Sequence, residues 1–267
     1  MIRSSISAIA LGVVLLSTAA TSIGQTTTYQ QMSPPGRAAF VSNRAEMIAL
    51  EISARKYPFT PEFISAIQQN IDSYLRRSQK SVDGEGNLLV VLQRGQVYAP
   101  ALGTAFQSRN LSPLLGIYLP MIESAYHNSA SSSMGALGMF QFLPSTGQLY
   151  GLSPEELLDV EKSADAAARY LIDNLERFRG DSMREALALL AYNRGTRKVA
   201  EDLKLVLTAS DRNCSICALT AASAQLDESF QRESVHYVPR FFAAAIIGEN
   251  PRAFGLETEP VSSYVKR

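Results

Sequence analysis

The sequence has no excess of either charge, because 25 Lys and Arg residues balance 25 Asp and Glu residues. Proteins that bind nucleic acid usually present a basic excess, so nothing in the charge balance favours a nucleic-acid partner. No acidic run indicates a solvating tail. Hydrophobic residues make up 46% of the 267 residues, enough for a packed core. The composition therefore predicts a globular chain of one large or two small domains.

Cysteine is scarce, with only Cys214 and Cys217 in a C-x-x-C spacing. A zinc site needs more ligands than these, and His236 is the only histidine nearby downstream. A redox centre like that of thioredoxin needs a preceding apolar strand, which the neighbouring residues do not provide. We expect a local disulfide in an exported protein, with two free thiols as the alternative, and neither a metal nor another cofactor.

The hydrophobic run at the N-terminus is short against the roughly 20 residues that a membrane-spanning helix needs. Arg3 precedes an apolar stretch over residues 6–16 and then small residues, the pattern of a secretory signal. We predict a signal peptide over residues 1–24, hence export to the periplasm or cell envelope, with an uncleaved anchor as the alternative. No cysteine lies near the possible cleavage sites, so the sequence does not predict a lipid anchor. The polar residues 25–36 predict a linker.

Strand-like alternation and internal repeats are also lacking. From residue 37 onward, apolar residues such as Ile67 and Ile71 instead recur at helical spacing. Ser112 followed by Pro113 is typical of a helix start, with a capping hydroxyl before a proline in the first turn. We predict a mostly α fold, in which an N-terminal helical region over 37–110 packs on a catalytic domain over 111–267.

A single carboxylate, Glu123, lies in the apolar segment over residues 114–126. A helix that is apolar nearly all round is buried inside its domain. Burial, together with the carbonyl end of the helix dipole, disfavours the ionised carboxylate and raises its pKa. The ordinary alternative is a glutamate on a solvated surface. A carboxyl group that stays protonated near neutral pH suits a general acid, so Glu123 is the candidate catalytic residue.

Four motifs occur in a fixed order along the chain. They are Glu123-Ser124, Gly138-Met139-Phe140-Gln141, Ala191-Tyr192-Asn193 followed by Gly195, and Tyr237-Val238-Pro239. Together they resemble the soluble lytic transglycosylase domain, a lysozyme-like family of goose type. They look most like its membrane-bound lytic murein transglycosylase D branch. The residues between Gly195 and Tyr237 match no part of the family pattern.

The resemblance implies a lysozyme-like helical fold with little or no β-sheet. It also implies an enzyme that cleaves the bond from N-acetylmuramic acid to N-acetylglucosamine in peptidoglycan and leaves 1,6-anhydromuramoyl ends. Glu123 would be its single general acid and base. The resemblance assigns substrate binding to Ser132, Met139, Gln141, Tyr192, Asn193 and Tyr237. The alternative roles of these six residues are ordinary loop, core and capping positions.

The sequence leaves several alternatives open. We interpret Asp159, Glu161 and Asp165 as solvated helix-end charges rather than as a second catalytic carboxylate. Two other functions are compatible with the same resemblance: a hydrolytic muramidase of goose type, which uses water, and an inactive peptidoglycan-binding scaffold. The sequence is equally compatible with a role in wall turnover and with a partner in the cell envelope or a secretion machine. The resemblance assigns no role to His127 or His236.

Overall fold

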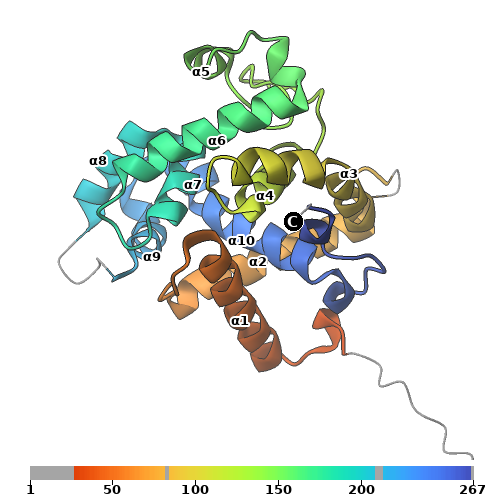
Figure 1. Ribbon diagram of the computed structural model, residues 1–267. Helices are drawn as coiled ribbons and strands as arrows, with labels where there is room; N and C mark the ends of the chain where they lie inside the picture. The colour runs from red at the N-terminus through yellow and green to blue at the C-terminus, as the bar shows by residue number, and fades with distance from the viewer. Residues whose placement is uncertain (1–26, 82–83, 208–212, 266–267) are drawn as a thin grey trace, which may run out of the picture.

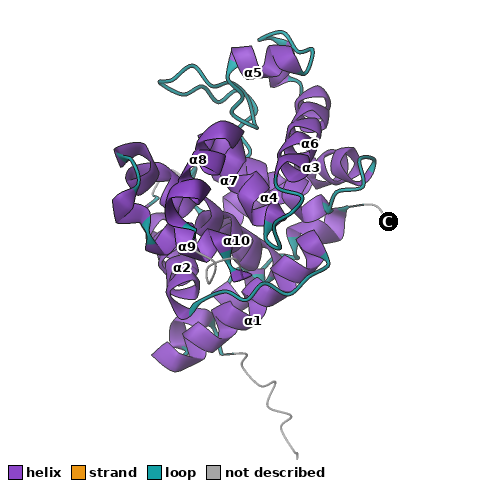
Figure 2. Cartoon of the chain, turned by 90° about the vertical axis from the view of Figure 1, so that its left-hand side faces the viewer, coloured by secondary structure: helices purple, strands orange, loops and turns teal. Residues whose placement is uncertain are grey.

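The computed structural model describes residues 27–81, 84–207 and 213–265, which are largely helical (Figure 2). In place of strands, these ranges hold only two isolated bridges, Ser131 with Leu137 and Leu137 with Phe142. The predicted mostly α fold with little or no β-sheet is confirmed. No helix within the same ranges has the length and hydropathy to cross a membrane. The predicted signal peptide over residues 1–24 lies outside the described residues.

The described residues form ten α-helices. In chain order they are α1 (Pro34–Ser53), α2 (Pro61–Lys80), α3 (Leu88–Gln107), α4 (Pro113–Ser124), α5 (Pro144–Leu149), α6 (Val160–Arg177), α7 (Arg184–Arg194), α8 (Thr196–Val206), α9 (Ser215–Ala221) and α10 (Val235–Glu249). The shorter 3-10 turns are η1 (Tyr29–Gln31), η2 (Glu156–Leu158), η4 (Ser223–Gln225), η6 (Pro251–Phe254) and η7 (Val261–Tyr264). One π-helical turn, η5 (Phe230–Ser234), leads directly into α10.

Helix α10 lies at the centre of the molecule, where it packs against α1, α2, α4 and α7 (Figures 1 and 2). All residues from Phe241 to Gly248 are buried. A helix that is apolar on every side has to be covered on every side, which explains its central position. Helix α5 lies at the upper edge of the molecule in Figure 1, far from α1 at the lower edge.

Helix α4 begins where the sequence predicts. The Ser112 hydroxyl accepts a hydrogen bond from the Leu114 backbone N–H at 3.3 Å, and Pro113 occupies the first turn. Every residue from Leu114 to Ile122 is buried. Gly116 permits this burial, because a Cβ there would lie 2.5 Å from Cδ2 of Phe106 on α3. The apolar segment thus runs through the core and carries Glu123 to the end of α4.

Part of the segment expected as a linker packs against the helical body. Tyr29 is fully buried, and its ring centroid lies 5.1 Å from that of Phe254. Helix α1 begins at Pro34 rather than at residue 37, because the Ser33 hydroxyl accepts the Gly36 N–H at 3.2 Å and two prolines suit a first turn. The polar composition of this segment concealed its single buried aromatic anchor.

Cys214 and Cys217 form the expected local disulfide, with their Cα atoms 5.2 Å apart. The bridge lies at the start of α9, where Cys214 precedes the first helical residue. Both cysteines are buried. The bridge therefore fixes the first turn of a short helix that packs against α2, α7 and α8.

Candidate active site

Glu123 lines a pocket of about 490 Å³. Ser132, Gln141, Tyr192 and Asn193, four of the residues that the resemblance assigns to substrate, line the same pocket. Its other lining residues are Met134, Ala136, Phe142, Leu143, Thr146, Tyr170, Arg194, Gly195 and Glu233. Segments far apart in the sequence therefore meet around one carboxyl group.

The surroundings of Glu123 favour its protonated form. Burial raises its pKa to about 7, against two weaker influences that lower it, the Tyr237 hydrogen bond and the positive charge of Arg240. The Tyr237 hydroxyl donates to Oε1 of Glu123, and the Arg240 guanidinium lies 5.5 Å from the Tyr237 ring centroid. The pKa shift has the direction that the apolar segment predicts, and the carboxyl group is poised to give and take a proton near neutral pH.

Ser124 joins the end of α4 to the turn that carries Gln141. Its hydroxyl donates to the Met139 carbonyl at 2.8 Å and lies 3.3 Å from the Pro120 carbonyl. The Met139 side chain is fully buried and does not line the pocket. The structure thus differs from the substrate contact expected of Met139: its carbonyl anchors the loop, while its side chain fills the core.

The turn between Gly138 and Gln141 requires glycine at its first position. Gly138 has a φ of +76°, and a Cβ there would lie 2.2 Å from the Leu157 carbonyl oxygen. Gln141 also has a left-handed φ, +50°, which costs a non-glycine residue roughly 1–2 kcal/mol. Its side-chain amide donates to the Gly138 carbonyl at 2.9 Å. Gln141 therefore braces the turn while it lines the pocket.

The other predicted substrate residues are held by hydrogen bonds. The Ser132 hydroxyl accepts the Ala136 N–H at 3.0 Å, and the Tyr192 hydroxyl donates to the Phe140 carbonyl at 3.0 Å. Asn193 is exposed at the pocket, where its Oδ1 accepts from the Ser234 hydroxyl at 3.1 Å. Each side chain is thus fixed before any ligand arrives, as a preorganised binding site requires.

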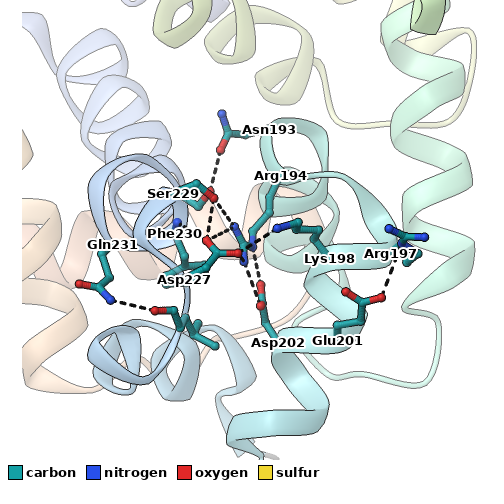
Figure 3. A network of polar contacts seen from close by, with 12 residues as sticks. Asn193, Arg194, Arg197, Lys198, Glu201, Asp202, Asp227, Ser229, Phe230 and Gln231 are labelled. Carbon is teal, nitrogen blue, oxygen red and sulfur yellow. Dashed lines mark hydrogen bonds and ion pairs between the residues drawn. The ribbon is translucent and has the colours of Figure 1, made fainter.

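Arg194 fastens the end of α7 to the segment that leads into η5 (Figure 3). Its side chain is only 3% exposed. It donates to the Asp202 carboxylate at 3.0 Å and to the Asp227 carboxylate at 2.9 Å. The guanidinium group holds the pKa of Asp227 well below its usual range through these hydrogen bonds. This ion-pair cluster, in which Arg194 and Asp202 are buried and Asp227 is exposed, keeps Asn193 and η5 together on one side of the pocket.

Several pocket residues were missed by the sequence analysis. Met134 and Leu143 are 82% and 44% exposed and supply apolar surface to the pocket. Glu233 brings a second carboxylate to it from the π-helical turn η5. It lies in the segment that matches no part of the family pattern. Of these residues, only Met134 had a signal in the sequence, because a methionine in a Ser- and Gly-rich loop is an unusual apolar residue.

The acidic residues considered as a second carboxylate lie elsewhere. Asp159 caps α6, where its Oδ1 accepts the Lys162 N–H at 3.0 Å. Asp165 forms ion pairs with Arg109 at 2.7 Å and Arg169 at 3.0 Å. Neither these two residues nor Glu161 line the pocket. Asp159 and Glu161 lie at the start of α6, as expected of helix-end charges, whereas Asp165 lies further along the helix in its ion pairs.

Part of the chain that contains this site is similar to known proteins. Residues 101–214 match the family model described as the transglycosylase SLT domain. Membrane-bound lytic murein transglycosylase D of Escherichia coli strain K12 is 28% identical over 189 residues, and so is its counterpart from Escherichia coli O6:H1. The match covers 69% of this chain but only 39% of each relative. Glu123 and most pocket residues lie inside the matched domain, whereas Glu233 and Tyr237 lie beyond it.

Proposed function

We propose that this protein is a peptidoglycan lytic transglycosylase in which Glu123 is the single general acid and base, since residues 101–214 match the model of the transglycosylase SLT domain. The main support is the carboxyl group of Glu123. Burial raises its pKa to about 7, and it lines a pocket of about 490 Å³ that can hold sugar residues. The names of the two relatives support the same substrate class.

In the first step, protonated Glu123 donates its proton to the oxygen between N-acetylmuramic acid and N-acetylglucosamine. A neutral carboxyl group can do so near pH 7 only because its surroundings disfavour ionisation. As the bond breaks, the N-acetyl group of the muramoyl residue stabilises the positive charge at C1. Tyr237 then donates to the carboxylate that remains.

In the second step, ionised Glu123 accepts the proton from the muramoyl C6 hydroxyl while that oxygen attacks C1. The product is a 1,6-anhydromuramoyl end, no water is consumed, and Glu123 is protonated again. One carboxyl group thus serves first as acid and then as base, which requires a pKa near the working pH.

One observation favours a second candidate, a hydrolytic muramidase. Glu233 lines the same pocket as Glu123, and a second carboxylate could activate a water molecule as general base. Hydrolysis would then leave reducing ends in place of anhydro ends.

We also propose export to the cell envelope, where the substrate lies. The support is the signal-like sequence over residues 1–24 and the disulfide between Cys214 and Cys217, which persists in oxidising compartments.

Mass spectrometry of digested cell wall tests the proposed chemistry. The wild-type protein should release muropeptides with anhydromuramoyl ends, and Glu233→Gln should release the same products at a similar rate. Reducing ends that disappear in Glu233→Gln would establish the muramidase instead. Absence of any cleavage by the wild-type protein would refute both enzymes.

A further inference from the structure

A second hollow, of about 220 Å³, shares the last turn of α4 with the catalytic pocket. Ile122 and Ala125, which flank Glu123 in the sequence, line this hollow. Its other walls come from α2, the start of α3 and α10. The hollow has less than half the volume of the catalytic pocket, so it suits a small group better than a sugar ring.

Two arginines line this hollow, Arg77, which is exposed, and Arg240, which is half-buried. Arg77 lies 4.8 Å from the Tyr74 ring centroid and Arg240 lies 5.5 Å from that of Tyr237. Among the residues that the structure describes, neither guanidinium has a hydrogen-bond or ion-pair partner, and Nε of Arg240 is buried without an acceptor. A buried donor without an acceptor is unfavourable, so this arrangement is suited to a ligand that supplies one.

The acidic group at this hollow does not neutralise the two arginines. Glu85 is already paired with Arg94 at 2.9 Å and with the His127 ring at 3.1 Å. Arg94 in turn donates to the Ala125 carbonyl at 2.8 Å, which fixes the pair against the end of α4. Among the described residues that line the hollow, the charge left unpaired is positive, which suits an anion.

We propose that Arg77 and Arg240 form an arginine pocket that binds a carboxylate of the peptide attached to the glycan strand. This inference rests on the proposed function, because peptidoglycan carries such peptides on the muramoyl residue, the sugar that Glu123 would act on. Paired guanidinium groups are well matched to carboxylates, through charge and through their parallel N–H donors. The arginine pocket would thereby select peptide-bearing strands over bare glycan.

Binding measurements on Glu123→Gln, which removes turnover, provide the test. The probes are a soluble disaccharide that bears the stem peptide and the same disaccharide with the peptide removed. Adding Arg77→Gln should weaken binding of the peptide-bearing probe about tenfold, the scale of one charge-assisted hydrogen bond, and leave the bare probe unchanged. Arg76→Gln is the matched control, because Arg76 is exposed on α2 as Arg77 is but does not line the hollow.

The outcomes separate the two proposals. Equal affinity of the Arg77→Gln and Arg76→Gln proteins for the peptide-bearing probe would overturn the arginine pocket, as would an equal loss of affinity for the bare probe. Wall digestion by the wild-type protein decides the proposed function independently, because the binding comparison needs no catalysis. Arg77 is preferred to Arg240 for substitution because Arg240 packs on the ring of Tyr237, whose hydroxyl contacts residue 123.

Discussion

At the scale of single residues, the pKa of Glu123 is set by influences of opposite sign. Burial raises the pKa to about 7, while the Tyr237 hydroxyl and the Arg240 charge lower it. A buried carboxyl without these two neighbours would hold its proton more tightly and would be a weaker acid in the first step. The pair Tyr237 and Arg240 thus keeps the pKa of Glu123 low enough for it to give its proton to the glycosidic oxygen.

Tyr237→Phe removes the hydrogen bond that lowers the pKa of Glu123. We expect the limb of the rate profile that falls with rising pH to move to higher pH, and the rate of the first step to fall, because a carboxyl group with a higher pKa is a weaker acid. The pH dependence of wall digestion measures this shift, with Tyr264→Phe, a change of an exposed tyrosine, as the control. An unmoved limb would show that Tyr237 does not act on the catalytic acid.

Glu123→Gln should abolish cleavage and leave the protein folded, because the amide oxygen still accepts from Tyr237. Relative to wild type, this variant should gain stability as the pH rises from about 5 to about 7. The reason is that the folded protein holds the Glu123 proton up to about pH 7, because burial raises its pKa from 4.5, whereas the unfolded chain releases this proton earlier, so wild-type stability falls across this interval. Thermal melts of both proteins across this pH range measure the difference. Residual cleavage by the variant would remove Glu123 from its role.

The sequence singles out Glu123 as a candidate because it is the only acidic residue in a continuous apolar segment. It could not reveal Arg240, which lies in another helix and reaches Glu123 only through tertiary packing. Met139 shows the same limit in the opposite direction: its place in a motif says nothing about whether its side chain points to the pocket or, as observed, into the core.

At the scale of elements, the loop between α4 and α5 depends on backbone conformations that its sequence does not indicate. Ala125, Tyr126 and Gln141 all have positive φ although none is glycine. Helix starts are predictable from local caps such as Ser112, whereas these conformations are imposed by contacts with the rest of the fold. The helices could therefore be predicted, but the shape of the loop between α4 and α5 could not.

Gly138→Ala and Gly135→Ala form a matched pair within this loop. Both glycines have positive φ, but a Cβ at Gly138 meets the Leu157 carbonyl at 2.2 Å, whereas a Cβ at Gly135 meets nothing within 4 Å. We expect Gly135→Ala to lower the free energy of unfolding by about 1 kcal/mol, and Gly138→Ala by about 3 kcal/mol with loss of cleavage. Denaturant titration measures both. Equal losses would show that the loop yields easily at Gly138.

The double substitution Cys214→Ser and Cys217→Ser opens the bridge at the start of α9. Because the closed loop is very short, the loop-entropy relation gives a loss of only about 2 kcal/mol in the free energy of unfolding. Cleavage should persist, since neither cysteine lines the catalytic pocket. Denaturant titration and wall digestion test this. A loss of cleavage at full folding would indicate a further role for the bridge.

At the scale of the whole molecule, the site depends on segments that only the complete fold brings together. Glu123 and Tyr237 are 114 residues apart in the chain but joined by a hydrogen bond. The Arg194 cluster and central helix α10 hold their two segments in place (Figure 3). The order of the four motifs was readable in the sequence. The position of Glu233 at the pocket was not, because it depends on how η5 turns toward the pocket.

Direct titration of Glu123 tests the central claim. Carboxyl-carbon NMR on the folded protein, with Glu123→Gln to assign the signal, reports the protonation of this group without requiring substrate. We predict a pKa of about 7 for Glu123, raised by burial inside the assembled fold. A value near that of an ordinary solvated glutamate, about 4.3, would contradict the account, because the carboxyl group would then be ionised before it could protonate the glycosidic oxygen.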